Sequence, residues 1–180
     1  MWPVHISHFL LLLHGPSLVY ATICQDQGYF TDAERQALIT AHNELRRTIA
    51  EGNQPNQQGT LPQAKNMYEL QYNCDMENIV KEEVGKCSGH ATLLEQYGQN
   101  FLVLPTANMP AGKTDRLNAA VGVWKGPQTY YGLNNISNYD DHRLYSFANM
   151  VNAKTLRFGC GYKADCNGGD IHISCIYNLE

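Results

Sequence analysis

Cysteine thiols and histidine imidazoles are the side chains of this sequence with the clearest capacity for chemistry. Cys87 and His90 lie within the stretch CSGH, a spacing that could pair a nucleophilic thiolate with a general base. Such a pair requires a free thiol. The chain contains six cysteines, and an even number in an exported chain favours disulfides. We therefore do not expect a catalytic pair at Cys87 and His90.

The cysteines could instead bind zinc. All of them follow residue 21, and they are Cys24, Cys74, Cys87, Cys160, Cys166 and Cys175. The sequence has no CxxC motif, and five residues separate Cys160 from Cys166 without a histidine-rich partner segment. Three disulfides are therefore expected in place of a structural zinc site, and the cysteine positions alone leave their pairing open.

The other histidines and the acidic residues form no recognisable catalytic group. His42 is expected on the inner side of a helix as a hydrogen-bonded core residue, His142 on a solvated loop, and His172 on the exposed face of a strand. Glu82 and Glu83 are helix neighbours that point in different directions, so they make a poor acid/base couple. No GxSxG, HExxH, phosphate-loop or dinucleotide-binding motif occurs.

Length and charge set the broad class of the protein. The chain has 180 residues, of which 43% are apolar and 17% charged, and this composition is typical of one globular domain. Its 13 basic and 17 acidic residues give a net charge of −4. No basic run or stripe is present, which argues against a nucleic-acid partner and against binding to an anionic membrane.

The N-terminal segment is typical of a secretory signal peptide. Phe9–Ala21 is apolar but shorter than the ~20 residues that a membrane-spanning helix needs. Val19 and Ala21 are small residues at the −3 and −1 positions of a cleavage site. We expect a signal peptide over 1–21, a secreted single domain over 22–180, and no membrane insertion.

Apolar periodicity predicts the elements that must position these residues. Thr31 to Glu34 reads as a capping box ahead of a helix that Gly52 ends. Further helices are expected over 73–86, 114–126 and 144–151, and extended segments over 100–105, 155–162 and 171–177. The last two segments would pair as a hairpin around NGGD. Helices followed by a terminal hairpin indicate an α+β fold. Asn135, in the loop sequence Asn-Ile-Ser, is a predicted glycosylation site.

Several blocks of the chain resemble one family of secreted proteins. The stretch AHNELRRTIAEGNQPNQQGTLPQAKNMYELQYNCDMENIV (41–80) resembles the N-terminal half of a CAP domain, the domain of cysteine-rich secretory, antigen 5 and pathogenesis-related proteins. GQNFLV, AAVGVWKGPQTYYG and NMVNAKTLRFGCGYKADC resemble its later blocks in the same order. LPxAKNM and AKTLxFGCGYKxxC are most similar to the nematode branch, the Ancylostoma secreted proteins, which includes hookworm neutrophil and platelet inhibitors.

The resemblance implies a fold and a disulfide pairing. The family fold is a three-layer α-β-α sandwich with a small antiparallel sheet between helical layers. By the same resemblance the expected pairs are Cys87 with Cys166, Cys160 with Cys175, and Cys24 with Cys74.

The resemblance also implies that the family's metal site is degenerate here. The family cleft carries two histidines and two acidic residues, and its histidines can hold a divalent metal. The matching positions are His90, Gln99, Pro127 and Ser146, and Asn152 stands where a tryptophan usually closes the last block. One imidazole does not make a zinc site, and an amide cannot carry the charge or the proton of a carboxylate. We therefore expect no metal, no cofactor and no enzymatic activity.

The expected function is binding. The resemblance implies a secreted parasite protein that binds a host protein, with an integrin-like receptor of platelet or leukocyte adhesion as the partner, although the chain has no RGD. Loops over 105–115, 127–142 and 166–170 are the expected contact surfaces. The alternative is an extracellular carrier of a sterol or fatty acid. Nothing in the sequence selects between a monomer and a homodimer.

Overall fold

A four-stranded sheet with the strand order β1-β3-β4-β2 forms the centre of the fold. The computed structural model describes residues 21–108, 110–133 and 141–178. The strands are β1 (Gln71–Tyr72), β2 (Tyr97–Pro105), β3 (Arg157–Cys166) and β4 (Asp170–Asn178). β4 pairs antiparallel with both β2 and β3, whereas β1 pairs parallel with β3. The sheet is therefore mixed, where the resemblance implied an antiparallel one.

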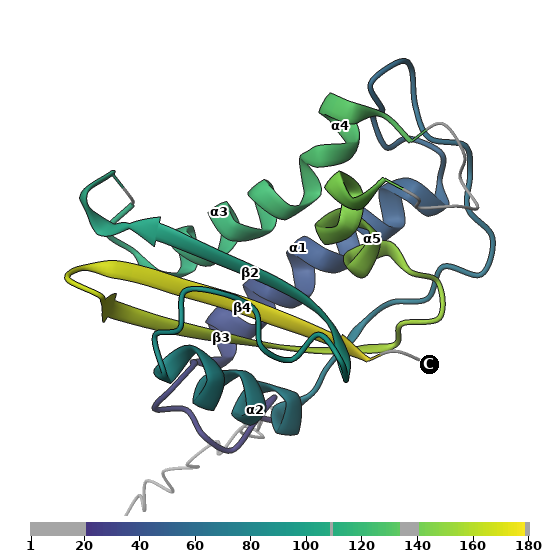
Figure 1. Cartoon of the computed structure of the whole chain (residues 1–180). Coiled ribbons are helices and arrows are strands. Elements are labelled where there is room, and N and C mark those ends of the chain that lie inside the picture. The colour runs from purple at the N-terminus through teal and green to yellow at the C-terminus, as the bar shows by residue number, and fades with distance from the viewer. Residues whose placement is uncertain (1–20, 109, 134–140, 179–180) are drawn as a thin grey trace, which may run out of the picture.

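Helices cover both faces of this sheet. They are α1 (Asp32–Ala50), α2 (Cys74–Gly85), α3 (Lys113–Lys125), α4 (Pro127–Tyr131) and α5 (Tyr145–Val151), with the short 3-10 helices η1 (Thr106–Asn108) and η2 (His142–Leu144). Helix α2 lies along one face, and α1, α3 and α5 lie on the other (Figure 1). This arrangement is the expected α-β-α sandwich, and the α+β class is confirmed. Among the described residues, none of the helices has both the length and the apolarity to cross a membrane.

Helix α1 begins where its local sequence signal predicts, whereas α3 begins earlier than predicted. Helix α1 begins as predicted, because the Thr31 hydroxyl accepts from the Glu34 amide at 3.2 Å and the Glu34 carboxylate accepts from the Thr31 amide at 2.8 Å. The third helix begins at Lys113, one residue before the predicted range of 114–126, with Gly112 as its N-cap. The Lys113 ammonium lies 4.4 Å from the centre of the Phe30 ring, and this contact accompanies the earlier start.

Two glycines in the stretch FGCG let α2 approach the sheet closely. A Cβ atom on Gly159 would lie 2.5 Å from the Glu77 amide nitrogen, and one on Gly161 would lie 2.7 Å from a methyl group of Val80. Only glycine permits such a close approach of backbone to backbone without a shift. These glycines bring the helix that carries Glu77 and Glu83 against the sheet.

Strand β4 is buried on both faces, which corrects the expectation for His172. Ile171, Ile173 and Cys175 belong to the large core under α1, α3 and α5, while Ile176 packs in a smaller core under α2. His172 was expected to be exposed because it lies opposite the isoleucines, but it is fully buried. The two faces of the strand alternate as the sequence predicts. The face that carries His172 packs against a second helical layer and not against water.

All six cysteines are paired, in the same three pairs that the resemblance implies. Cys24 is bonded to Cys74, Cys87 to Cys166, and Cys160 to Cys175. The first bond ties the segment before α1 to the start of α2, and the second ties the chain just after α2 to the end of β3. Because no cysteine is free, Cys87 has no thiol for catalysis in this state.

Candidate functional site

Three of the four positions that the resemblance assigns to the family's metal site line one open depression. His90, Gln99 and Ser146 border it together with Trp124 and Tyr145. Pro127, at the start of α4, is not among the residues that line it. These three positions therefore share one depression, and the question becomes what their side chains can do there.

Gln99 is engaged in a buried polar cluster and not directed toward a ligand. Its amide nitrogen donates to the Glu83 carboxylate at 2.7 and 2.5 Å and to the Ser174 hydroxyl at 3.0 Å. Its amide oxygen accepts from the Leu93 backbone at 2.8 Å. Glu83 also accepts from both the backbone amide and the hydroxyl of Thr92 at 2.8 Å. Every polar atom of the Gln99 side chain thus has a protein partner.

Ser146 and His90 also make local hydrogen bonds. The Ser146 hydroxyl donates to the Trp124 carbonyl at 3.0 Å, which joins α5 to α3. The exposed His90 ring lies 3.0 Å from the Ser88 carbonyl through Nδ1. In the described part of the chain, His90 belongs to no group of three potential metal ligands. A single exposed imidazole beside an amide and a hydroxyl offers neither a zinc site nor an acid/base couple.

Sequence reasoning missed the importance of Glu83. In the sequence it stands out only as the helix neighbour of Glu82, with which it makes a poor acid/base couple. Its position, seven residues after Met76 and three after Val80, places it on the inner face of α2. Helical spacing could therefore have found a buried carboxylate, although not its partner Gln99.

A buried hydrogen-bond network connects the depression to α1. The His42 ring contacts the Leu38 carbonyl through Nδ1 at 2.8 Å and the Tyr177 hydroxyl through Nε2 at 2.9 Å. Because a carbonyl can only accept, Nδ1 carries the proton and Nε2 accepts from Tyr177. Asn100 then donates to Tyr177 at 3.3 Å and to the Ser146 carbonyl at 2.9 Å. His42 is thus the hydrogen-bonded core residue that its helical position predicts.

Acid is expected to destabilise the protein through His42. Burial lowers the pKa of His42 from 6.5 to about 4. The unfolded chain therefore binds a proton below pH 6.5 that the folded protein does not take up until about pH 4. Stability from this group is complete above pH 6.5 and is lost as the pH falls toward 4, by about 3 kcal/mol in total. Urea unfolding across this range measures the loss, and the variant His42→Gln should show a shallower slope. Equal slopes would contradict the assignment.

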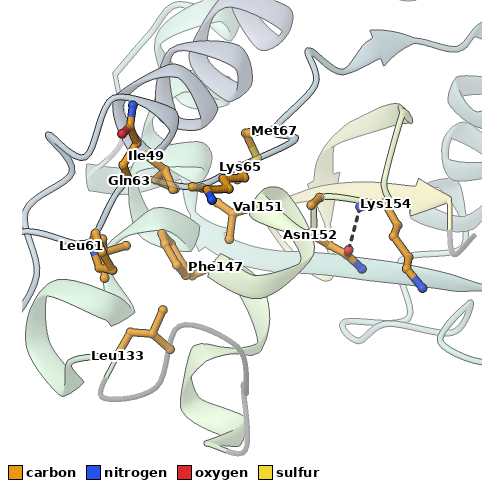
Figure 2. Close-up of a pocket in the computed structure, with 13 residues that line it drawn as sticks. Ile49, Leu61, Gln63, Lys65, Met67, Leu133, Phe147, Val151, Asn152 and Lys154 are labelled. Carbon is orange, nitrogen blue, oxygen red and sulfur yellow. Dashed lines mark hydrogen bonds between the residues drawn. The ribbon is translucent and has the colours of Figure 1, made fainter.

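An apolar cavity of about 560 Å³ lies apart from the depression, between α1, α5 and the loop that leads to β1. Figure 2 shows Leu61, Leu133, Phe147 and Val151 around it. Asn152 and the exposed Lys65 and Lys154 also line it.

Asn152 lies at the end of α5 beside this cavity, and its side-chain oxygen accepts from the Lys154 amide at 3.0 Å (Figure 2). The resemblance places a tryptophan, a larger side chain, at this position. Arg46 holds the segment in place by donating to the Asn152 carbonyl at 2.9 Å and to the Met150 carbonyl at 3.0 Å. The cavity therefore has one wall of fixed backbone, and Lys65 and Lys154 are among the residues that line it.

Exposed aromatic side chains gather at the end of α3 and α4. Tyr130 is 74% exposed and Tyr131 44% exposed, and the Arg143 guanidinium lies 4.3 Å from the centre of the Tyr131 ring. Asp141 binds Arg143 with oxygen–nitrogen distances of 2.6 to 3.0 Å, which fixes the guanidinium in place. We call Tyr130, Tyr131 and Arg143 the α4–η2 face.

The expected contact loops are only partly loops. The segment 105–115 holds η1 and the start of α3, and 127–142 holds all of α4. The segment 166–170 is the tight turn between β3 and β4. Asn135 lies outside the described residues, so its glycosylation stays a prediction.

Comparisons with known proteins agree with these features. The model of the cysteine-rich secretory protein family, CAP, matches residues 39–177. The Ancylostoma secreted protein of Ancylostoma caninum is 30% identical over 155 residues, which cover 86% of this chain and 36% of that protein. The chain therefore spans about a third of this relative's length.

Solved structures share the fold. The crystal structure of Na-ASP-1 superposes with a TM-score of 0.78 at 30% identity, over 86% of this chain and 38% of that one. The hookworm platelet inhibitor superposes with a TM-score of 0.65 at 23% identity, over 88% of this chain and 75% of that one. At that level of identity the second likeness concerns the fold alone.

Proposed function

The chain belongs to the CAP family of cysteine-rich secretory proteins, and from this premise we propose that it is a secreted, non-enzymatic protein that binds a receptor on host cells. The depression that His90 borders is the main support for a non-enzymatic protein. The Gln99 amide and the Ser146 hydroxyl there already make hydrogen bonds to the protein. Secretion rests on the predicted signal peptide over 1–21 and on a relative named as a secreted protein. An integrin of platelet or leukocyte adhesion is the proposed receptor class, supported by the fold shared with the hookworm platelet inhibitor.

The α4–η2 face is the proposed contact surface. Tyrosine and arginine are enriched among the residues that dominate protein interfaces. Here an arginine is held by Asp141 and stacked on a tyrosine, so little side-chain freedom is lost when a partner binds. Tyr130 and Tyr131 also lie within 127–142, one of the segments predicted to make contacts, whereas Arg143 directly follows that segment.

Alanine variants of this face test the proposal. Arg143→Ala and Tyr130→Ala should each raise the Kd for the receptor about 10-fold or more. The measurement is surface plasmon resonance against purified integrin ectodomains. Tyr68→Ala is the matched control, because Tyr68 is 60% exposed but precedes β1, away from α4. If Tyr68→Ala weakened binding as much as Tyr130→Ala, the contact surface would be placed wrongly.

A carrier of amphipathic lipids is the second candidate, and the apolar cavity supports it. Its volume of about 560 Å³ and its apolar walls suit an acyl chain, and Lys65 and Lys154 could pair with a carboxylate. A fatty acid fits this combination better than a sterol, which has no anionic group.

A tryptophan substituted at position 152, where the resemblance places one, provides the test of the lipid proposal. Asn152→Trp should fill the cavity and abolish binding of a fluorescent fatty acid. Asn152→Ala, which removes the amide without adding bulk, should leave binding within about 3-fold of the wild type. Fluorescence titration and mass spectrometry of extracted lipid give the readout. Undiminished binding by Asn152→Trp would rule out this cavity.

A further inference from the structure

His172 is buried on β4 without a hydrogen-bond partner. It has no exposed surface, and neither of its ring nitrogens makes a hydrogen bond to the protein. Its ring packs edge-on against Phe101, with 5.5 Å between the ring centres. Buried polar atoms normally find partners, so two unpartnered nitrogens on one imidazole require an explanation.

The Cys87–Cys166 disulfide lies beside this imidazole. The two sulfur atoms and a ring nitrogen of His172 all lie within 4.8 Å of one another. Among the described residues, no other group of three histidine, cysteine or acidic side chains comes this close together. The other disulfides, Cys24–Cys74 and Cys160–Cys175, therefore have no such companion.

We propose that Cys87, Cys166 and His172 form a latent site for zinc or a similar thiophilic cation, which opens when a thiol reductant cleaves the disulfide. While the sulfur atoms are bonded to each other they are poor ligands. Reduction by a dithiol breaks the sulfur–sulfur bond with two electrons and two protons, forms two cysteine thiols, and oxidises the dithiol to its own disulfide. A bound Zn²⁺ then displaces the two thiol protons to solvent.

The geometry suits tetrahedral coordination. Zinc binds sulfur at about 2.3 Å and imidazole nitrogen at about 2.0 Å, which places neighbouring ligand atoms about 3.5 Å apart. On metal binding, the two sulfur atoms would move apart from their bonded distance, and the His172 ring nitrogen, which now lies within 4.8 Å of both, would turn toward the metal. The fourth ligand would come from solvent at the half-buried Cys87 side. The disulfide is accessible to a reductant because Cys87 is only half-buried, whereas Cys166 is fully buried.

Cobalt binding to the reduced protein tests this site. The purified protein is reduced with dithiothreitol, desalted without oxygen, and titrated with Co²⁺, whose thiolate charge-transfer and tetrahedral bands report the ligands directly. We expect one Co²⁺ per chain in the reduced protein and no such bands in the oxidised protein. Excess Zn²⁺ should displace the cobalt.

Variants identify the ligands. His172→Phe keeps the ring volume and should weaken Co²⁺ binding about 100-fold or more, because one of three protein ligands is lost. Cys87→Ala with Cys166→Ala should abolish it. Mass spectrometry after alkylation keeps the test decisive if a variant fails to fold, because Zn²⁺ should protect only Cys87 and Cys166 in the wild type. Equal affinity in His172→Phe, protection of other cysteines, or no metal binding to the reduced protein would overturn the proposal.

Discussion

Replacing Gln99 with glutamate, an acidic residue of the kind that the resemblance implies at this position, is expected to destabilise the protein by about 3 kcal/mol at pH 7. The Gln99 amide nitrogen lies 2.5 and 2.7 Å from the oxygens of the Glu83 carboxylate, and both side chains are 2% exposed. A second carboxylate there would leave two negative charges in contact away from water. One of the two must take up a proton, so the pair gains a pKa well above the ordinary value of a glutamate.

The sign of the pH dependence separates this effect from general damage. A carboxyl whose pKa is raised in the folded state contributes its full stability below its unfolded pKa of about 4.3. That stability is lost as the pH rises through the folded value. The deficit of Gln99→Glu relative to the wild type should therefore be small near pH 4 and grow toward pH 7 or 8. Urea unfolding at several pH values measures it.

A double variant gives the matched control. Gln99→Glu with Glu83→Gln exchanges the amide and the carboxylate. A carboxylate at position 99 can still accept from the Leu93 amide, and it can accept from the Ser174 hydroxyl, which in the wild type accepts from the Gln99 amide. Most of the lost stability should return. If the double variant were as unstable as Gln99→Glu alone, charge repulsion would not be the cause. Recovery in the double variant would instead show that a glutamate at position 99 is not tolerated beside the Glu83 carboxylate.

Loss of the Glu77 charge is expected to cost about 3–5 kcal/mol, because it removes the carboxylate that the buried Arg35 guanidinium binds most closely. Asp32, which is 3.5 Å from Nη1 of Arg35 and more exposed, then remains as the other counter-charge. Arg35 and Glu77 are fully buried, and Arg35 donates to the two Glu77 oxygens at 2.8 and 2.7 Å. The Tyr72 hydroxyl donates to the same carboxylate at 2.7 Å. This ion pair connects α1 to α2 around the edge of the sheet.

Glu77→Gln is the informative change, because the amide keeps the shape and can still accept from Tyr72. Its effect should exceed that of Arg35→Met with Glu77→Gln, in which no buried charge remains. Thermal and urea unfolding of the wild type, the two single variants and the double variant give the coupling energy. Additive losses would show that the charge pairing itself contributes little, and would contradict this reading.

The helical layers and the hairpin could be predicted from sequence because their signals are local. The capping box at Thr31 and the alternation in 171–177 each specify an element without reference to the rest of the chain. The resemblance to a family fold, which rests on several sequence blocks in the same order, then predicted how these elements pack. The two-residue strand β1 carries no such signal, because its pairing with β3 depends on the whole fold.

The polar interior could not be predicted in the same way. Glu83 and Gln99 are 16 residues apart, and Arg35 and Glu77 are 42 apart, so no local pattern joins them. Alternation placed His172 on the correct face of β4, but it cannot tell whether water or α2 covers that face. The cavity beside Asn152 likewise depends on how α5 and the loop before β1 meet. Sequence indicated which side chains to examine, and the structure shows which contacts those side chains make.

The measurement that tests the account most directly is receptor binding by a variant of the depression beside a variant of the surface. His90→Ala removes the imidazole that the family site would use, and Arg143→Ala removes the cation of the α4–η2 face. In surface plasmon resonance on purified integrin ectodomains, the wild type and His90→Ala should bind saturably with equal Kd, while Arg143→Ala should bind about 10-fold more weakly or worse. No saturable binding by the wild type, or binding lost only in His90→Ala, would contradict the proposal that this protein acts through its surface and not through the chemistry of its depression.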